Sequence, residues 1–472
     1  MHFHSLDYIL FLLLVVCGYW LLLTHRMMRL VLVLVASCAF YMAWSPTYIV
    51  LILGSTVLDY TAGLRMHAAT DPRVRRGWLL ASLCGNLGLL GVFKYYNFFN
   101  TAVADVLAVG GVHVEPSRLD VLLPVGISFY TFQTLSYTID IYRGRMEPTR
   151  NFVRFACFVT FFPQLVAGPI VRASELLPQL AKHPRLDPSR VSDALFLIAT
   201  GLVKKVAIAD YVAVNFVDRV FEDPTGYSAA EVMVGLYGYT LQIYCDFSGY
   251  TDVARGSAKL FGLELPENFD RPYQAKNPAE FWRRWHMTLS SWLRDYLYFP
   301  LGGSRARPAR AYFNLWLTMF LIGLWHGASW NFVIYGSLQA TAVVIHRLVS
   351  RRSSRDPADD SLGAHVTKVL LTMHFVVLSR VFFRAADFDN ATAVWTQLGG
   401  GGLTLGHVPD SVWLVLLGGL GAHYTPRSWF EAIRLRFVGL PAPAQGAALA
   451  TVGGGLMLVV SQGVVPYIYF QF

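Results

Sequence analysis

The chain has 472 residues, of which 39 are basic and 30 acidic, so its formal net charge is +9. Hydrophobic residues make up 54% of it and charged residues only 15%, whereas an average soluble domain carries about 25% charged residues. This composition excludes an ordinary cytosolic enzyme, a disordered protein and a disulfide-stapled secreted domain, and it predicts an all-α polytopic membrane protein.

The N-terminal half contains five apolar runs that we expect to cross a membrane, since a crossing helix needs about 20 residues. They lie near residues 6–23, 30–43, 47–64, 78–93 and 121–142. The first run has no basic region before it and no small-residue cleavage site, so we expect a retained span rather than a removed signal.

Basic clusters predict which side of the membrane the connecting loops face, because loops rich in Lys and Arg stay in the cytoplasm. Such clusters lie at residues 26–29, 65–76 and 143–154. Two predicted spans separate each cluster from the next, so all three are expected to be cytoplasmic. The N-terminus and residues 467–472 are then predicted to lie on the outer side.

The second half is less regular. Residues 161–169 are apolar but hold two prolines and a glycine, which predicts a bent or re-entrant element. Residues 266–310 are the least membrane-like. Further apolar runs follow at 311–325, 328–347, 365–383, 412–422 and 446–466. The length allows about ten to twelve spans, and with no repeat or linker visible, residues 1–472 are predicted to form one integral domain.

Two aspartates, Asp246 and Asp252, interrupt an apolar region, where they could bind a cation, relay protons or orient a histidine. Their spacing is no metal signature, and the five cysteines are scattered through apolar runs, so no metal site is predicted. No phosphate-binding loop, nucleophile elbow or zinc-protease motif is present. The basic loops and anionic lipid account for the net charge, so no nucleic-acid partner is expected.

His286 lies in a segment that we expect to form one helix from Pro278 to Asp295. At helical spacing His286 would share a face with Trp282 and Leu289. One interpretation is an interfacial amphipathic helix in which His286 has no chemical role. The other is a helix that contributes this histidine to a functional site.

His326 lies between two apolar runs, beside Gly323 and Gly327, which permit close backbone approach. An ionisable side chain at membrane depth is costly and by default indicates function. The alternative is a histidine that only makes a hydrogen bond inside the helical bundle. Burial favours neutral imidazole, which can act as a general base.

Four motifs follow one another along the second half of the chain. They are Asp246-Phe-Ser-Gly-Tyr-Thr-Asp252, Leu265-Pro-Glu-Asn-Phe-Asp270, Pro278-Ala-Glu-Phe-Trp-Arg-Arg-Trp-His286 and Leu324-Trp-His-Gly-Ala-Ser-Trp-Asn331. Together they resemble the membrane-bound O-acyltransferase family, and most closely its branch of bacterial alginate O-acetyltransferases and D-alanyl transfer proteins. The similarity runs over most of the chain.

The resemblance implies a helical funnel with re-entrant and interfacial helices, in which a cytosolic acyl donor meets an extracytoplasmic acceptor. His326 matches the family's catalytic histidine, and His286 matches its second important histidine. We hypothesise that neutral His326 accepts the proton of the acceptor hydroxyl. His286, Trp325 or Asn331 would position the donor carbonyl or orient the base.

Trp285 and Asp246 belong to the same motifs and are further candidates for binding or positioning the substrate. A thioester is already activated, so no bound cofactor is expected, and acetyl-CoA is the expected donor.

The last residues, Tyr467-Ile-Tyr-Phe-Gln-Phe472, resemble a tail linked in related acyl-export systems to a transient acyl acceptor, with Tyr469 as the acceptor. The alternative is an aromatic residue at the outer membrane interface.

The predicted function is transfer of an acetyl group across the bacterial cytoplasmic (inner) membrane for O-acetylation of an exported polysaccharide such as alginate. The resemblance implies an extracytoplasmic SGNH-type acetyltransferase and the polysaccharide synthesis and export machinery as partners. Two alternatives stay open. One is D-alanyl transfer from a carrier protein to teichoic acid, and the other is a transporter, which also uses broken helices and intramembrane charges.

Overall fold

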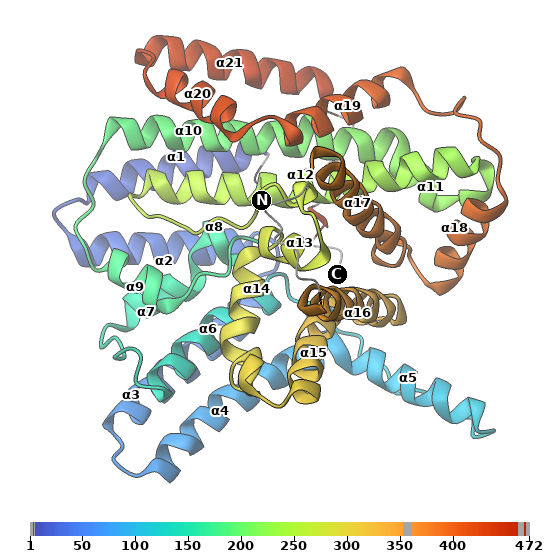
Figure 1. The fold of residues 1–472 in the computed structure, drawn as a ribbon. Coiled ribbons are helices and arrows are strands. Elements are labelled where there is room, and N and C mark those ends of the chain that lie inside the picture. Colours follow the sequence, from blue (N-terminus) through green and yellow to red (C-terminus); the bar gives the residue numbers. More distant parts are fainter. Residues whose placement is uncertain (1–2, 4, 353–360, 461–466, 469–472) are drawn as a thin grey trace. The chain divides into compact units, whose positions relative to one another are not determined.

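A computed structural model describes residues 3, 5–352, 361–460 and 467–468. Every regular element in these residues is a helix (Figure 1), which confirms the predicted all-α class. Contacts divide the chain into two compact units, Met1–Ala194 with Ser257–Pro266 and Leu195–Gly256 with Glu267–Phe472.

The helices of the first unit begin at local capping signals. The Ser5 side chain accepts the N–H of Tyr8 at the start of α1, and Asp71 accepts the N–H of Arg73 beside Pro72, the first residue of α4. Such caps satisfy backbone donors that have no partner within the helix. The helices are α1 (Leu6–Leu21), α2 (Arg26–Met42), α3 (Ile49–Ala68), α4 (Pro72–Leu90), α5 (Tyr96–Val109), α6 (Ile127–Tyr142), α7 (Phe152–Thr160), α8 (Phe162–Leu165) and α9 (Ala173–Leu180).

The second unit contains the helices that carry three of the four motifs, and the motif at 265–270 lies in a segment without helix. Two helices, α10 (Pro188–Leu202) and α12 (Ala229–Leu260), have residues in both units. The others are α11 (Asp218–Glu222), α13 (Pro278–Arg284), α14 (Met287–Leu293), α15 (Pro308–His326), α16 (Trp330–Arg352), α17 (Leu362–Arg384), α18 (Phe388–Gly400), α19 (Asp410–Tyr424), α20 (Arg427–Val438) and α21 (Ala442–Val459).

Five helical segments are long and apolar enough to cross a membrane, judged by length and composition. They are Ile49–Ala68, Pro72–Val109, Trp330–Ser350, Leu362–Arg384 and Ala442–Val459. Each overlaps an apolar run predicted from the sequence. The span expected near 78–93 is part of a longer helical segment, because a π-helical turn at Gly91–Tyr95 joins α4 to α5. The direction of each crossing and the total of ten to twelve spans stay predictions, as does the single domain.

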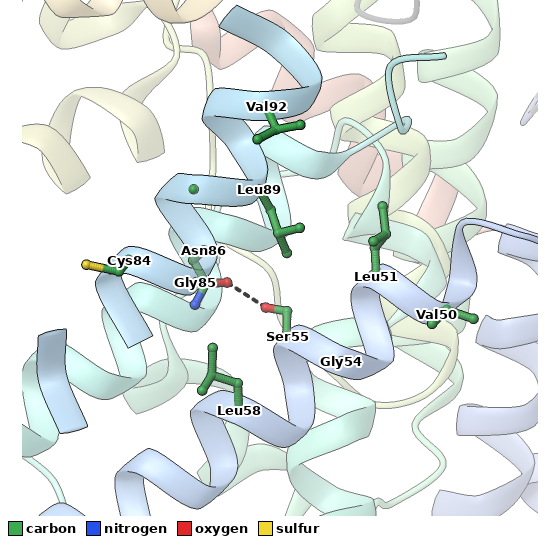
Figure 2. Close-up of a pocket in the computed structure, with 11 residues that line it drawn as sticks. Val50, Leu51, Gly54, Ser55, Leu58, Cys84, Gly85, Asn86, Leu89 and Val92 are labelled. Carbon is green, nitrogen blue, oxygen red and sulfur yellow. Dashed lines mark hydrogen bonds between the residues drawn. The ribbon is translucent and has the colours of Figure 1, made fainter. Parts of the chain in front are cut away.

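A cavity of about 460 Å³ lies between α3 and α4 in the first unit (Figure 2). Its walls are aliphatic, and in its lining the Ser55 hydroxyl donates to the Asn86 side-chain oxygen over 2.5 Å. The Asn86 amide in turn donates to both carboxylate oxygens of buried Asp59. This network satisfies polar groups inside an apolar span, and the lining of the cavity includes none of the predicted site residues.

The bend predicted at residues 161–169 is confirmed. Helix α7 ends at Thr160, where Phe161 leaves helical geometry, and the short helix α8 follows. Gly168 packs so closely that a β-carbon there would lie 2.4 Å from the Cα of Gln164. The sequence indicated this break through its prolines and glycine.

Two glycine contacts set the helix crossings of the second unit. A β-carbon on Gly323 of α15 would lie 2.2 Å from the Cα of Gly336 on α16, which confirms the close approach expected at Gly323. A β-carbon on Gly249 of α12 would lie 2.7 Å from the carbonyl oxygen of Gly201 on α10. These crossings place the ends of α15 and α16, and the middle of α12, where the candidate site lies.

Candidate active site

The single helix predicted from Pro278 to Asp295 is wrong, because the chain breaks at Trp285 and His286. Trp285 is extended, and His286 is left-handed with φ 44° and ψ 55°. His286 therefore shares no continuous helical face with Trp282 and Leu289. Residues with a β-carbon rarely adopt positive φ, and those that do cluster at functional sites.

Asn268, in the second motif, holds this break in place. Its carbonyl accepts the N–H of Met287, and its side-chain oxygen accepts both the N–H and the hydroxyl of Thr288. Nearby, the N–H of Asp270 donates to the carbonyl of Arg284. The motif at 265–270 therefore acts as a brace that caps α14 from outside the helix.

His286 is fully buried among aromatic rings. Its ring centre lies 4.8 Å from that of Phe247 and 5.6 Å from that of Trp325. Burial, together with the nearby His326, lowers the pKa of His286 well below its ordinary value. His286 is therefore neutral at physiological pH.

His326 is the last residue of α15 and is also buried. Its Nδ1 lies 2.7 Å from the carbonyl oxygen of Ile322. A carbonyl can only accept, so Nδ1 carries the proton and donates it to this bond. In the neutral ring the lone pair then belongs to Nε2.

Trp325 joins the two histidines, since its ring contacts His286 and lies 5.0 Å from the ring centre of His326. Other rings that contact His326 include Phe383, at 5.2 Å, and Tyr335, at 6.4 Å. The structure therefore brings His286, Trp325 and His326 into one cluster. The Trp285 ring stacks nearly parallel on that of Phe281, with ring centres 5.6 Å apart.

Arg380 belongs to the same aromatic cluster and was missed from the sequence. It lies on α17 and is 1% exposed, with its guanidinium carbon 4.7 Å from the Trp285 ring centre and 5.1 Å from that of Phe383. Aromatic faces attract such a cation. The signal was available, because Arg380 is a charged residue inside the apolar run at 365–383, where charge indicates function.

His423, on α19, has no distinctive neighbours in the sequence. In the structure it is buried and its Nε2 accepts the N–H of Tyr273 over 3.2 Å. Its ring lies 4.7 Å from that of Tyr244. These contacts fix the loop that leads into α13, a role that no local sequence pattern signals.

Asn331 stands in the first turn of α16, where its amide donates to the carbonyls of Ala385 and Asp387. These bonds tie the start of α16 to the end of α17. Asp246 precedes Phe247 on α12 and belongs to an ion cluster with Lys205 and Asp210. Tyr469 lies outside the described residues. Within the described ranges, no group of three or more His, Cys, Asp or Glu side chains is placed to hold a metal ion.

Residues 147–365 match the model of the membrane-bound O-acyltransferase family. A peptidoglycan O-acetyltransferase of Helicobacter pylori is 37% identical over 79% of this chain and 74% of its own length. A probable alginate O-acetylase of Azotobacter vinelandii is 40% identical over 78% of this chain and 72% of its own. The chain belongs to the membrane-bound O-acyltransferase family.

As a member of the membrane-bound O-acyltransferase family, the protein is an acyltransferase and a multi-pass membrane protein. Both histidines lie within the residues that match the family model, whereas Arg380 and residues 467–472 lie outside them. A teichoic acid D-alanyltransferase of Bacillus subtilis is more distant, at 26% identity over 59% of this chain and 72% of its own length. Family membership supports an acyltransferase rather than the transporter alternative.

Proposed function

We propose that this chain transfers an acetyl group from a cytosolic thioester, with acetyl-CoA as the donor, to an acceptor on the outer side of the cytoplasmic membrane. The acetyl group then modifies a hydroxyl of a cell-surface or exported polysaccharide such as alginate. Relatives named for acetylation of peptidoglycan and alginate, at 37% and 40% identity, support acetyl rather than D-alanyl transfer.

The bond between His326 Nδ1 and the Ile322 carbonyl carries the proposal for the chemistry. It leaves the lone pair on Nε2, which takes the proton of the acceptor hydroxyl as its oxygen attacks the thioester carbonyl. The C–O bond forms, the C–S bond breaks, and the departing thiolate takes the proton back from the imidazolium. The products are an ester and a free thiol, and the histidine returns to its neutral form.

The neighbouring residues have supporting roles in this proposal. His286, at the break between α13 and α14, positions the donor carbonyl or orients the base, and in its neutral form it adds no positive charge that would oppose protonation of His326. Trp325 and Trp285 form aromatic walls that position the thioester. Asn331 acts indirectly, because its hydrogen bonds to the carbonyls of Ala385 and Asp387, just after α17, hold the residues that follow His326.

Replacement of the proposed base tests this mechanism. A general base contributes about 10²–10⁴-fold in rate, so His326→Gln should lower transfer from labelled acetyl-CoA in proteoliposomes at least a hundredfold. The matched control is His346→Gln on α16, a histidine outside the aromatic cluster, which should retain transfer. Equal activity of His326→Gln and wild type, at equal protein level, would exclude His326 as the base.

We also propose that Tyr469 carries the acetyl group transiently, on the basis of the tail that contains it. In that step the phenol oxygen takes the acetyl group from the thioester and its proton goes to the thiol. Peptide mass analysis during turnover should find an acetyl adduct on Tyr469 that is lost when acceptor is added. The Tyr469→Phe variant is the negative control, because it has no hydroxyl to acetylate. A wild-type peptide without an acetyl adduct contradicts this step.

A separate extracytoplasmic acetyltransferase of the SGNH type, working with the polysaccharide synthesis and export machinery, would deliver the group to the polymer. Mass analysis of surface polysaccharide from cells with and without the intact gene tests this part. Supplying a D-alanyl carrier protein in place of acetyl-CoA separates the two donor classes, because only the true donor should label the acceptor.

A further inference from the structure

Lys205 lies at the centre of a buried ion cluster in the second unit. Its Nζ is 2.7 Å from a carboxylate oxygen of Asp246 and 2.7 Å from one of Asp210. The lysine side chain is fully buried, and the carboxylates are 3% and 12% exposed. The close contact of Gly249 with Gly201 brings α12 against the segment that carries Lys205.

The segment Tyr467-Ile468 contacts this cluster. The second carboxylate oxygen of Asp246 accepts the backbone N–H of Ile468 over 2.9 Å. The Lys205 ammonium lies 4.4 Å from the centre of the Tyr467 ring, which packs edge-to-face with the ring of Tyr250 of α12, with centres 4.7 Å apart. Both residues of the segment are buried.

We propose that Lys205 and Asp246 are positioning residues that hold Tyr467-Ile468 inside the protein, in one fixed register, for acyl transfer. This inference rests on the proposed function. Each contact specifies a different feature of the segment. Asp246 accepts the backbone N–H of Ile468 and therefore fixes the register of the segment. Lys205 and Tyr250 contact the aromatic side chain of Tyr467, one residue earlier.

Stability alone does not explain why ionised groups occupy this place. A buried ion pair often contributes no more to stability than well-packed apolar residues of similar volume. Charged and hydrogen-bonding groups do provide a unique geometry, because an alternative register would leave a buried carboxylate without its N–H donor. The sequence predicted Asp246 as a substrate-positioning residue. In the structure, Asp246 contacts the Tyr467-Ile468 segment of the same chain.

Thiol labelling of an Ile468→Cys variant tests the contact without measuring activity. In the detergent-solubilised full-length protein the introduced thiol should react slowly with maleimide, because Ile468 is 4% exposed. Adding Asp246→Leu or Lys205→Met should raise the labelling rate at this position at least tenfold. Peptide mass analysis separates the introduced thiol from the five native cysteines.

The matched control is Asp252→Asn. The Asp252 carboxylate bonds to Lys204 over 2.6 Å and joins the same two elements, but this pair is partly exposed and Lys204 faces Tyr244. Labelling of the introduced thiol should stay slow in this variant. Should Asp246→Leu not fold, Asp246→Asn removes the charge but keeps an acceptor oxygen, and its labelling rate should be intermediate.

Transfer activity tests the positioning role. Asp246→Leu and Tyr467→Ala should each lower acetyl transfer, and the double variant should be no less active than the less active of the two single variants, because either change releases the same segment. Losses that multiply, or unchanged labelling in folded Asp246→Leu and Lys205→Met, overturn the proposal. His326→Gln should abolish transfer yet leave labelling of the introduced thiol slow, so failure of the proposed function is distinguished from failure of this contact.

Discussion

His286 holds a backbone conformation that a residue with a β-carbon adopts only when its surroundings impose it. The left-handed region costs such a residue about 1–2 kcal/mol, and glycine enters it without that penalty. The hydrogen bonds from Met287 and Thr288 to Asn268 impose it here. An imidazole ring is thus retained at a position where glycine would be the more stable choice for the backbone.

Two substitutions at this residue separate its ring from its backbone. His286→Gly and His286→Ala both remove the ring, so both should lose most acetyl transfer. His286→Gly should unfold at a higher temperature than His286→Ala, by a difference of about 1 kcal/mol in the free energy of unfolding. Thermal unfolding in detergent measures this difference. Equal stability of the two variants would show that the conformation at 286 carries no strain.

At the scale of helices, the crossing of α15 with α16 fixes where His326 lies. Gly323 precedes His326 by three residues and meets Gly336 so closely that no side chain fits between them. Because backbone atoms form both sides of this contact, a new β-carbon cannot be accommodated by a rotamer change. The helices must separate, and the aromatic cluster around His326 must shift with them.

Gly323→Ala should therefore destabilise the protein by about 3 kcal/mol and lower acetyl transfer together with stability. Gly418→Ala on α19 is the control, since within the described residues a β-carbon there meets no atom within 4 Å. The free energy of unfolding of that variant should rise by up to about 1 kcal/mol, because alanine has a higher helix propensity than glycine. Thermal unfolding and transfer assays check both variants, and a Gly323→Ala protein as stable as wild type contradicts the expectation.

The broken helix at 278–293 shows why local patterns could not predict every element. The first half has sound helix signals, with Asn277 as the cap of α13 and Pro278 in its first turn. The break comes from bonds to Asn268, about twenty residues earlier. Helical periodicity reports only neighbours along the chain, whereas the geometry at His286 depends on a tertiary contact.

For the whole molecule, composition alone predicted the class, because apolar runs long enough to cross a bilayer admit few structures other than helices. The motifs also identified His286, Trp325 and His326, which the structure brings together in the aromatic cluster, but not Arg380. The sequence could not pair Lys205 with Asp246, or Asp246 with Ile468, which is 222 residues away. Such pairings depend on how helices cross.

The position of His326 at the end of α15 has one more consequence. The aligned peptide dipoles of a helix leave partial negative charge at its C-terminal end, where a positive group is stabilised by about 0.3–1 kcal/mol at exposed sites and by up to about 2 kcal/mol when partly buried. The Ile322 carbonyl that bonds the imidazole belongs to this last turn. In the proposed mechanism this ring gains a proton during each catalytic cycle, and the end of the helix that holds it favours the protonated state.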